Sequence, residues 1–176
     1  MNKCPTCHKN MSRAGLLYRC STKTCETASW DKIEVLERIK NFDKGSEKWK
    51  QQVNKILLEA GVELELRNKY YVYQLKMTGE LKPRARLMEG IKLYVGETGL
   101  HPIHRYLHHI LGYNTTTKSK AQELASSLVK YEGPYETRTE AKNKEKETSV
   151  ALHKSGHEVY GNGLEKKFKK ERDKDH

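Results

Sequence analysis

No hydrophobic run in the sequence approaches the roughly 20 residues that a transmembrane helix needs, which excludes a bilayer-spanning segment. The first residues, MNKCPTCHKN, are basic and polar, and the apolar core of a secretory signal does not follow them. We therefore expect an intracellular, cytoplasmic protein that has no membrane partner.

Acidic residues are in deficit. The chain has 23 Asp and Glu against 34 Lys and Arg, which gives a formal net charge of +11 and a pI near 9.4. A surface with this excess attracts polyanions through electrostatic steering and through release of their counterions. The charge balance therefore predicts a nucleic-acid partner, which we expect to be DNA, with RNA as a second possibility.

Cysteine is scarce, but its four copies are grouped. Cys4 and Cys7 are separated by two residues, Cys20 and Cys25 by four, and twelve residues lie between the pairs. In a reducing compartment such thiols are metal ligands or free groups rather than disulfides. Each short spacing lets one turn present two thiolates to the same ion, and the intervening MSRAGLLYR is long enough for a hairpin. The pattern predicts a closed tetrahedral Zn²⁺ site, not four unrelated cysteines.

The residues around these cysteines add a possible binding surface. The segment CPTCHKNMSRAGLLYRCSTKTC resembles the small Cys4 zinc ribbons at the C-termini of type IA topoisomerases. Proteins hold single-stranded nucleic acid with positive charge and stacking rings. The ribbon offers both, in Lys9, Arg13, Tyr18, Arg19 and Lys23. Zinc ribbons also serve as purely structural modules, so that alternative stays open.

A chain of 176 residues can bury one modest core and one small satellite module. We expect a zinc ribbon at 1–30, a helical connector at 31–61, a main domain at 62–164 and a basic, disordered tail at 165–176. In the connector, Ile33, Leu36, Ile39 and Phe42 recur every three residues and predict one amphipathic helix. A second helix follows Ser46, its expected cap, and ends near Gly61.

The main domain alternates strand and helix patterns. The segment at 62–66 and the β-branched and aromatic segments at 69–76 and 91–98 predict strands, the last two forming a hairpin. Residues 103–113 have helical spacing that leaves Arg105, His108 and His109 mostly off the apolar stripe. A polar helix is expected at about 137–154. The predicted fold class is α+β, a small antiparallel or mixed sheet flanked by helices.

Between residues 69 and 162 the order of residues resembles the GIY-YIG nuclease superfamily. Tyr71-Val72-Tyr73 lies where the family has its GIY strand and Tyr94-Val95-Gly96 where it has its YIG strand. Arg105 matches the arginine of the family's helix, and His109 matches the histidine of that helix. Glu145 matches the family's glutamate, and Asn162 its closing asparagine. The sequence departs from the family at Tyr71, which replaces the glycine of GIY, and in a longer loop at 74–93.

The resemblance implies a metal-dependent endonuclease whose Glu145 holds Mg²⁺ or Mn²⁺, with Glu140 and Glu147 as alternative ligands. It implies that Arg105 grips the scissile phosphate through a bidentate fork and that Tyr73 helps to deprotonate water. It assigns Tyr94 and His109 to positioning the phosphate or relaying protons, and Asn162 to tying the glutamate helix to the sheet.

Other interpretations stay open. Each tyrosine taken singly is more often a packing residue in a strand. His101, His104, His108 and His109 form a histidine cluster that is a candidate second metal site, because His104 and His108 are one helical turn apart. The protein as a whole is alternatively a non-catalytic nucleic-acid-binding zinc protein with a decayed nuclease-like core, or an RNA-processing or ribosome-associated protein.

Overall fold

The structure, a computed structural model, describes residues 3–64, 69–78, 91–113 and 125–161. Within these residues the fold is α+β, as predicted. Seven strands form one mixed sheet in the order β1-β2-β3-β6-β4-β5-β7. The strands are β1 (Met11–Ala14), β2 (Leu17–Cys20), β3 (Ala28–Trp30), β4 (Tyr70–Met77), β5 (Lys92–Thr98), β6 (Ala125–Tyr135) and β7 (Glu158–Tyr160). The described helices are α1 (Lys32–Ile39), α2 (Glu47–Glu59), α3 (Pro102–Leu111) and α5 (Arg138–Lys154).

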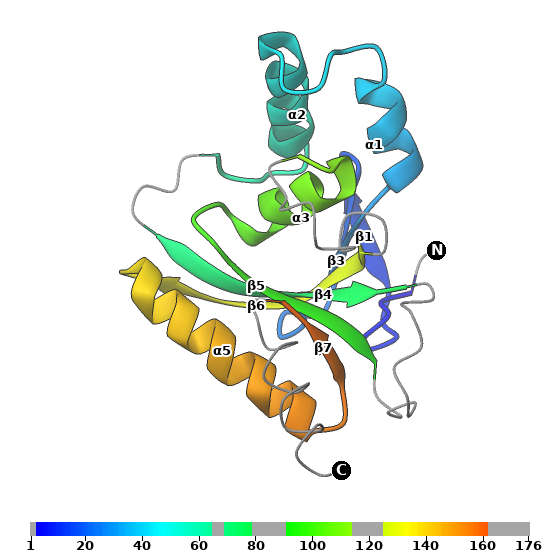
Figure 1. Cartoon of the computed structure of the whole chain (residues 1–176). Coiled ribbons are helices and arrows are strands. Elements are labelled where there is room, and N and C mark those ends of the chain that lie inside the picture. The colour runs from blue at the N-terminus through cyan, green and yellow to red at the C-terminus, as the bar shows by residue number, and fades with distance from the viewer. Residues whose placement is uncertain (1–2, 65–68, 79–90, 114–124, 162–176) are drawn as a thin grey trace, which may run out of the picture.

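The helices cover both faces of the sheet. Helix α3 lies on one face with α1 and α2 stacked beyond it, and α5 lies on the opposite face (Figure 1). Along β4 the side chains alternate accordingly, since Tyr73 and Leu75 belong to the larger core beneath α3, while Val72 packs with Ala141 of α5. Two hydrophobic layers therefore sandwich the central strands.

The helical connector has the predicted caps. The Ser46 side chain accepts a hydrogen bond from the backbone N–H of Trp49 and so starts α2, and Asp31 caps α1 in the same way. The predicted apolar face of this helix was wrong at Ile33 and Leu36, which are exposed, and correct at Ile39 and Phe42, which pack into the core. Val35 and Ile39, four residues apart, are buried, whereas Ile33 is 78% exposed. At 100° per residue, two successive steps of three place Ile33 about 120° around the helix from Ile39, whereas the single step of four from Val35 to Ile39 changes the direction by only about 40°.

The ribbon and the central elements also follow the prediction. Strands β1 and β2 form the expected hairpin between the cysteine pairs, and β4 pairs antiparallel with β5. Helix α3 occupies the expected segment and ends at Gly112, which has left-handed backbone geometry. Helix α5 begins with a capping box formed by Thr137 and Glu140.

Three strands were missed. Strand β3 has only three residues, too few for an alternating pattern to reveal it. The first half of β6 contains small and polar residues, and its burial does not alternate, which hides it from a search for period two. Strand β7 has only three residues and is parallel to β5, so its partner is distant in sequence. Residues 62–64 of the expected strand at 62–66 are not in a strand. The rest of that segment, Asn162 and the tail at 165–176 lie outside the described residues.

The ribbon is joined to the main sheet through β3 and β6. Ala28 pairs with Leu128, and the Thr27 hydroxyl lies 3.3 Å from the Val129 carbonyl oxygen, 2.7 Å from the Thr6 hydroxyl and 3.3 Å from Cys25 Sγ. The joint therefore begins two residues after a cysteine of the ribbon. The division of residues 1–164 into ribbon, connector and main domain stays a prediction. One sheet contains strands from both the ribbon and the main domain.

The same joint unites the hydrophobic core. Leu16, Leu17 and Trp30 of the ribbon belong to one buried cluster with Tyr106 and Leu107 of α3. The Trp30 indole also donates a hydrogen bond to the Ile103 carbonyl oxygen, at 3.3 Å. The ribbon is thus packed against the helix that carries the candidate arginine.

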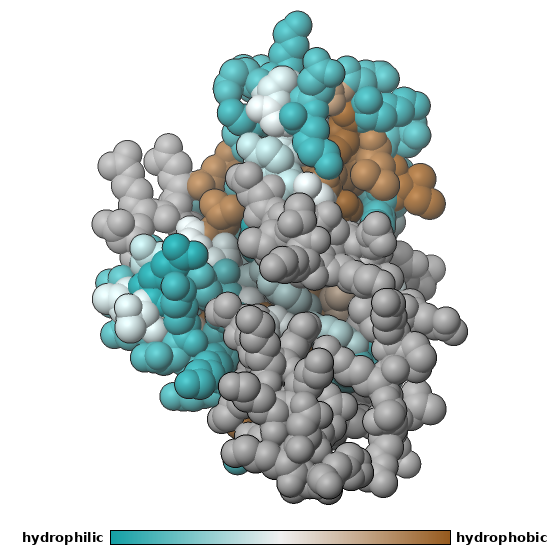
Figure 2. All heavy atoms as spheres, viewed as in Figure 1, coloured by the Kyte–Doolittle hydropathy of each residue, from teal (hydrophilic) through white to brown (hydrophobic). Residues whose placement is uncertain are grey.

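The exposed faces differ in character. Hydrophilic residues cover α5, while apolar residues reach the surface around α1 and α2 (Figure 2). Ile33, Leu36 and Leu58 are the exposed large hydrophobic residues of these two helices. Among the described helices, none has the length and apolar character needed to cross a membrane.

We predict that Thr27→Val destabilises the protein by about 1–3 kcal/mol, because the hydroxyl is buried and its three polar neighbours lose a partner. Urea unfolding measures the change. The matched control is Thr24→Val in the preceding loop, where the side chain is exposed and the change should stay within about 0.5 kcal/mol. Equal effects of the two variants would contradict the role given to the Thr27 hydroxyl.

Candidate active site and cysteine cluster

The four cysteine sulfurs lie together at the end of the ribbon. All four Sγ atoms are within 4.8 Å of one another, with Cys4 3.6 Å from Cys25 and Cys7 3.3 Å from Cys20. Tetrahedral Zn²⁺ with bonds of about 2.3 Å requires sulfurs about 3.8 Å apart. The described residues therefore contain a cysteine cluster that could bind a metal ion such as zinc.

Hydrogen bonds favour the thiolate of Cys4, whereas burial raises the pKa of Cys25 to about 11. The amide of Thr6 points to Cys4 Sγ at 3.4 Å, and that of Thr22 points to Cys20 Sγ at 3.5 Å. Burial raises the pKa of Cys4, but backbone N–H groups of Cys7 and Thr6 outweigh it and lower this pKa to about 6. A donor set of four sulfurs with N–H donors around them suits zinc and excludes hard ions such as Mg²⁺.

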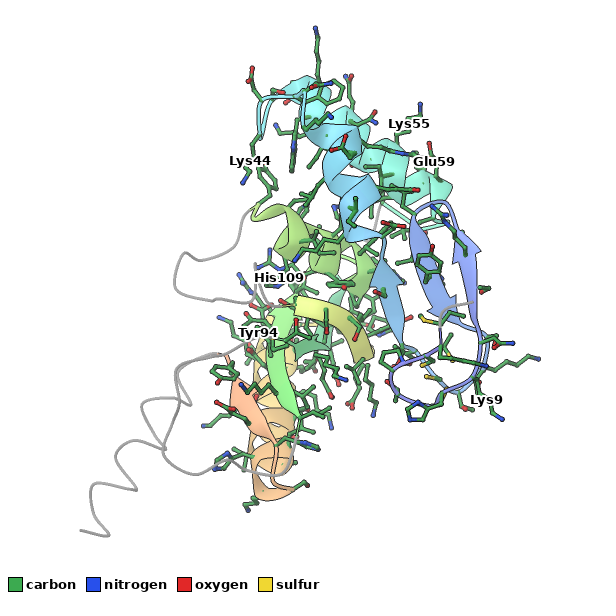
Figure 3. All side chains as sticks on the ribbon, turned by 90° about the vertical axis from the view of Figure 1, so that its right-hand side faces the viewer. Lys9, Lys44, Lys55, Glu59, Tyr94 and His109 are labelled. Carbon is green, nitrogen blue, oxygen red and sulfur yellow. The ribbon has the colours of Figure 1, made fainter. Side chains whose placement is uncertain are left out.

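The candidate nucleic-acid residues of the ribbon differ in exposure and partners. Lys9 and Lys23 are exposed, and Lys9 extends from the cysteine end of the ribbon (Figure 3). Arg13 forms an ion pair with Glu34 at 2.6 Å, and its guanidinium lies 5.4 Å from the centre of the Tyr18 ring. Arg19 donates to the Ala60 carbonyl oxygen at the end of α2, at 3.1 Å. Its position is therefore partly structural, and binding by these residues stays a prediction.

Four of the predicted catalytic side chains meet at one point on the α3 side of the sheet. The Tyr73 hydroxyl lies 2.7 Å from His109 Nε2 and 3.4 Å from Arg105 Nε. The ring of Tyr94 is 6.1 Å from that of Tyr73 and 5.2 Å from that of His109. Tyr94 on β5 and His109 on α3 lie next to each other in Figure 3. Residues from three elements, up to 36 positions apart in the chain, thus form one polar cluster.

Gly96 makes the close approach of the two tyrosines possible. A Cβ atom at this position would lie 2.7 Å from the Tyr73 hydroxyl and 2.9 Å from the Tyr94 ring. Both distances are too short for carbon, so any larger residue would displace a tyrosine. The glycine of the Tyr94-Val95-Gly96 segment is therefore required by the neighbouring side chains.

Burial sets the protonation of the cluster. It raises the pKa of Tyr73 well above its ordinary value near 10, and the charge of Arg105 opposes this only in part. Burial also lowers the pKa of His109 to about 3, with further contributions from Arg105 and His108. At neutral pH the cluster thus holds a protonated phenol and a neutral imidazole beside one guanidinium.

Glu145 approaches from the other layer of the molecule. It lies on the buried stripe of α5 with Ala141 and Ser149 and is 3% exposed, whereas Glu140 and Glu147 are exposed. The pKa of Tyr94 is raised chiefly by burial, and the charges of Arg105 and Glu145 act on it with opposite signs. The pKa of Tyr94 is therefore influenced by charges on both sides of the sheet.

Two histidines are more buried than the sequence predicted. His108 and His109 were expected mostly off the apolar stripe of α3, but they are 7% and 1% exposed. Tyr113, which packs on Trp49 of α2, covers His108, while Tyr73 and Tyr94 cover His109. Helical periodicity could not show this, because the aromatic rings that cover both histidines come from outside the helix.

One ion pair beside the cluster was not foreseen. The Arg138 side chain donates from Nε and Nη2 to Glu97 Oε1, at 2.9 and 2.7 Å. Glu97 follows Gly96 directly, and Arg138 is the first residue of α5. The pair therefore holds the start of the glutamate helix against β5. In the sequence, the only indication of this ion pair was the charged residue Glu97 directly after Gly96.

Comparisons with family models, with curated proteins and with solved structures give no match for this chain.

We predict one zinc ion per chain in protein purified with reduced thiols, measured by elemental mass spectrometry. Cys25→Ser should lose most of the metal, because three thiolates bind more weakly than four. Ser12→Ala, an exposed change on β1 of the same ribbon, is the control and should retain it. Metal-free wild-type protein with four titratable thiols would contradict the assignment.

We predict that Gly96→Ala lowers the free energy of unfolding by about 1–3 kcal/mol, because the new methyl group overlaps the Tyr73 hydroxyl. The control is Gly99→Ala in the turn after β5, where the nearest atom is Tyr70 Cε1 at 3.7 Å, an ordinary contact. Chemical denaturation compares the two. A tolerated Gly96→Ala would mean that Tyr73 has room to move.

Proposed function

We propose that this protein is a metal-dependent endonuclease of the GIY-YIG type that hydrolyses phosphodiester bonds in DNA. The observation that carries the proposal is the cluster in which Tyr73 lies within hydrogen-bond distance of both His109 and Arg105, with Tyr94 beside them. These are residues that the resemblance selects, and packing alone does not require an arginine next to a buried phenol.

Arg105 is the phosphate-binding group in this proposal. Its Nε hydrogen bond to the Tyr73 hydroxyl fixes one edge of the guanidinium. A planar guanidinium binds two phosphate oxygens with parallel hydrogen bonds, which the point charge of lysine does not reproduce. The partly exposed Arg105 is thus the contact between the buried cluster and a polyanion.

Tyr73 and His109 act together in our scheme. A phenol whose pKa is raised by burial is not a base at neutral pH by itself. Its hydroxyl, however, lies 2.7 Å from the Nε2 of a neutral imidazole. Tyr73 can therefore accept a proton from the attacking water only as its own proton passes to His109 Nε2, which leaves a neutral phenol and an imidazolium.

Glu145 would hold Mg²⁺ or Mn²⁺, since a single buried carboxylate with waters is the ligand set that such hard ions use. When bound, the ion would neutralise charge on the phosphate oxygens. Asn162, the residue proposed to tie the glutamate helix to the sheet, lies outside the described residues. The zinc ribbon, with exposed Lys9 and Lys23, would add affinity for nucleic acid.

A non-catalytic nucleic-acid-binding protein is the second candidate. Two observations favour it, namely the tyrosine at position 71 in place of the family's glycine and the raised pKa of Tyr73. This candidate keeps the basic surface and the ribbon but assigns no chemistry to the cluster.

The test incubates supercoiled plasmid with wild type, Arg105→Ala and Glu145→Gln, with Mg²⁺ or with EDTA, and follows nicking on a gel. We expect Mg²⁺-dependent nicking that falls by about 10²–10³-fold in each variant, the usual loss when one transition-state contact is removed. The controls are Glu147→Gln, an exposed change on α5, and Arg38→Ala on α1, which should retain activity.

Circular dichroism separates loss of chemistry from loss of fold. If wild type cuts neither plasmid nor branched DNA nor RNA but still binds them, the endonuclease proposal is wrong and the non-catalytic binder is correct. Equal nicking by wild type and both site variants would point to a contaminating nuclease.

A further inference from the structure

A pair of histidines on α3 lies next to the candidate active site but takes no part in it. His104 and His108 are one helical turn apart, and their Nε2 atoms are 3.2 Å from each other. Two histidines with this spacing on one helix face form the bidentate half of many zinc sites. His101 and His109 are engaged elsewhere, since His101 Nδ1 accepts from the Ile103 amide and His109 contacts Tyr73.

We propose that His104 and His108 together bind one borderline divalent ion, Zn²⁺ or Ni²⁺, at a site separate from the cysteine cluster. This site does not depend on the proposed nuclease activity.

The distance between the two nitrogens suits a shared ion. Ligand nitrogens about 2.0–2.1 Å from a metal are about 3.0 Å apart at a right angle and about 3.4 Å apart at the tetrahedral angle. The observed 3.2 Å lies between these values. The two nitrogens are therefore already at the separation that a shared ion requires.

The two imidazoles are in the form that binds metals. Burial lowers the pKa of His104 to about 4 and that of His108 to about 3, and the nearby positive charge of Arg105 contributes to both shifts. Both rings are thus neutral at pH 7. Without an ion they share one hydrogen bond between their Nε2 atoms, and binding requires a change of tautomer but no net loss of a proton.

Surrounding contacts hold one ring and leave the other accessible. His108 is 7% exposed, and its ring packs against the edge of Tyr113 at 5.2 Å. His104 is only half-buried and offers a route for the ion from solvent. His108 Nδ1 is buried and has no hydrogen-bond partner among the described residues, whereas its Nε2 contacts that of His104.

The donor set selects the kind of ion. Two imidazole nitrogens suit zinc, nickel and copper, whereas Mg²⁺ prefers oxygen. Among the described residues, no third histidine, cysteine or carboxylate joins the pair, since the cysteine cluster is the one group of three or more such ligands. Water would fill the other positions, and Arg105 would oppose the ion's charge, so we expect affinity well below that of the cysteine cluster.

The test uses full-length protein without an affinity tag, already loaded with one zinc ion per chain. Isothermal titration with ZnCl₂, and separately with NiCl₂, should show one further equivalent bound. Affinity should fall at least tenfold in His104→Gln and in His108→Gln. His153→Gln, which removes a histidine from α5, is the matched control and should bind like wild type.

A second readout keeps the test valid if the buried His108 variant fails to fold. In wild type, ¹H–¹⁵N spectra of the histidine rings should show that the added ion shifts the Nε2 signals of His104 and His108 and leaves that of His153 unchanged. The half-exposed His104→Gln should keep its melting temperature without added metal. No second equivalent in wild type, or undiminished binding in a folded His104→Gln, would overturn the proposal.

Discussion

The position of β6 between β3 and β4 is the constraint on which the rest of the structure depends. Through Ala28 and Thr27 this strand holds the cysteine-containing ribbon, and through its pairing with β4 it holds the strand that carries Tyr73. Trp30 of the ribbon then packs with α3, the helix of Arg105 and His109. Because the ribbon supplies part of the core, its metal would stabilise more than the ribbon itself.

Burial, more than charge, defines the chemistry that the candidate site can perform. Tyr73 and His109 are almost completely buried, and the cost of desolvating a charge keeps both neutral. Arg105 is the cation in contact with this pair, and it remains partly exposed. The cluster therefore combines a buried tyrosine–histidine contact with one partly exposed cation. The same low dielectric keeps His104 and His108 neutral on the adjacent surface of α3.

The two faces of α3 explain why one short helix carries so many roles. Ile103, Leu107 and Ile110 fill the core, while four of its polar residues meet partners from β4 or from the helix itself. Glu145 belongs to a different layer, and its charge contributes to the raised pKa of Tyr94. The ion pair of Glu97 with Arg138 joins the start of α5 to β5, next to the Tyr94-Val95-Gly96 segment. The position of Glu145 relative to Tyr94 therefore depends on how α5 packs on β5.

Local patterns in the sequence determined the cysteine pairs, the ribbon hairpin, both connector helices with the Ser46 cap, the β4–β5 hairpin and the capped start of α5. Each depends on spacing or capping within a few residues. Only the tertiary structure decided the insertion of β6, the burial of His108 and His109, the buried face of α1 and the choice of Glu145 over Glu140 and Glu147 as the inward-facing carboxylate. These features depend on contacts between segments far apart in the chain, which the order of residues along one segment does not contain.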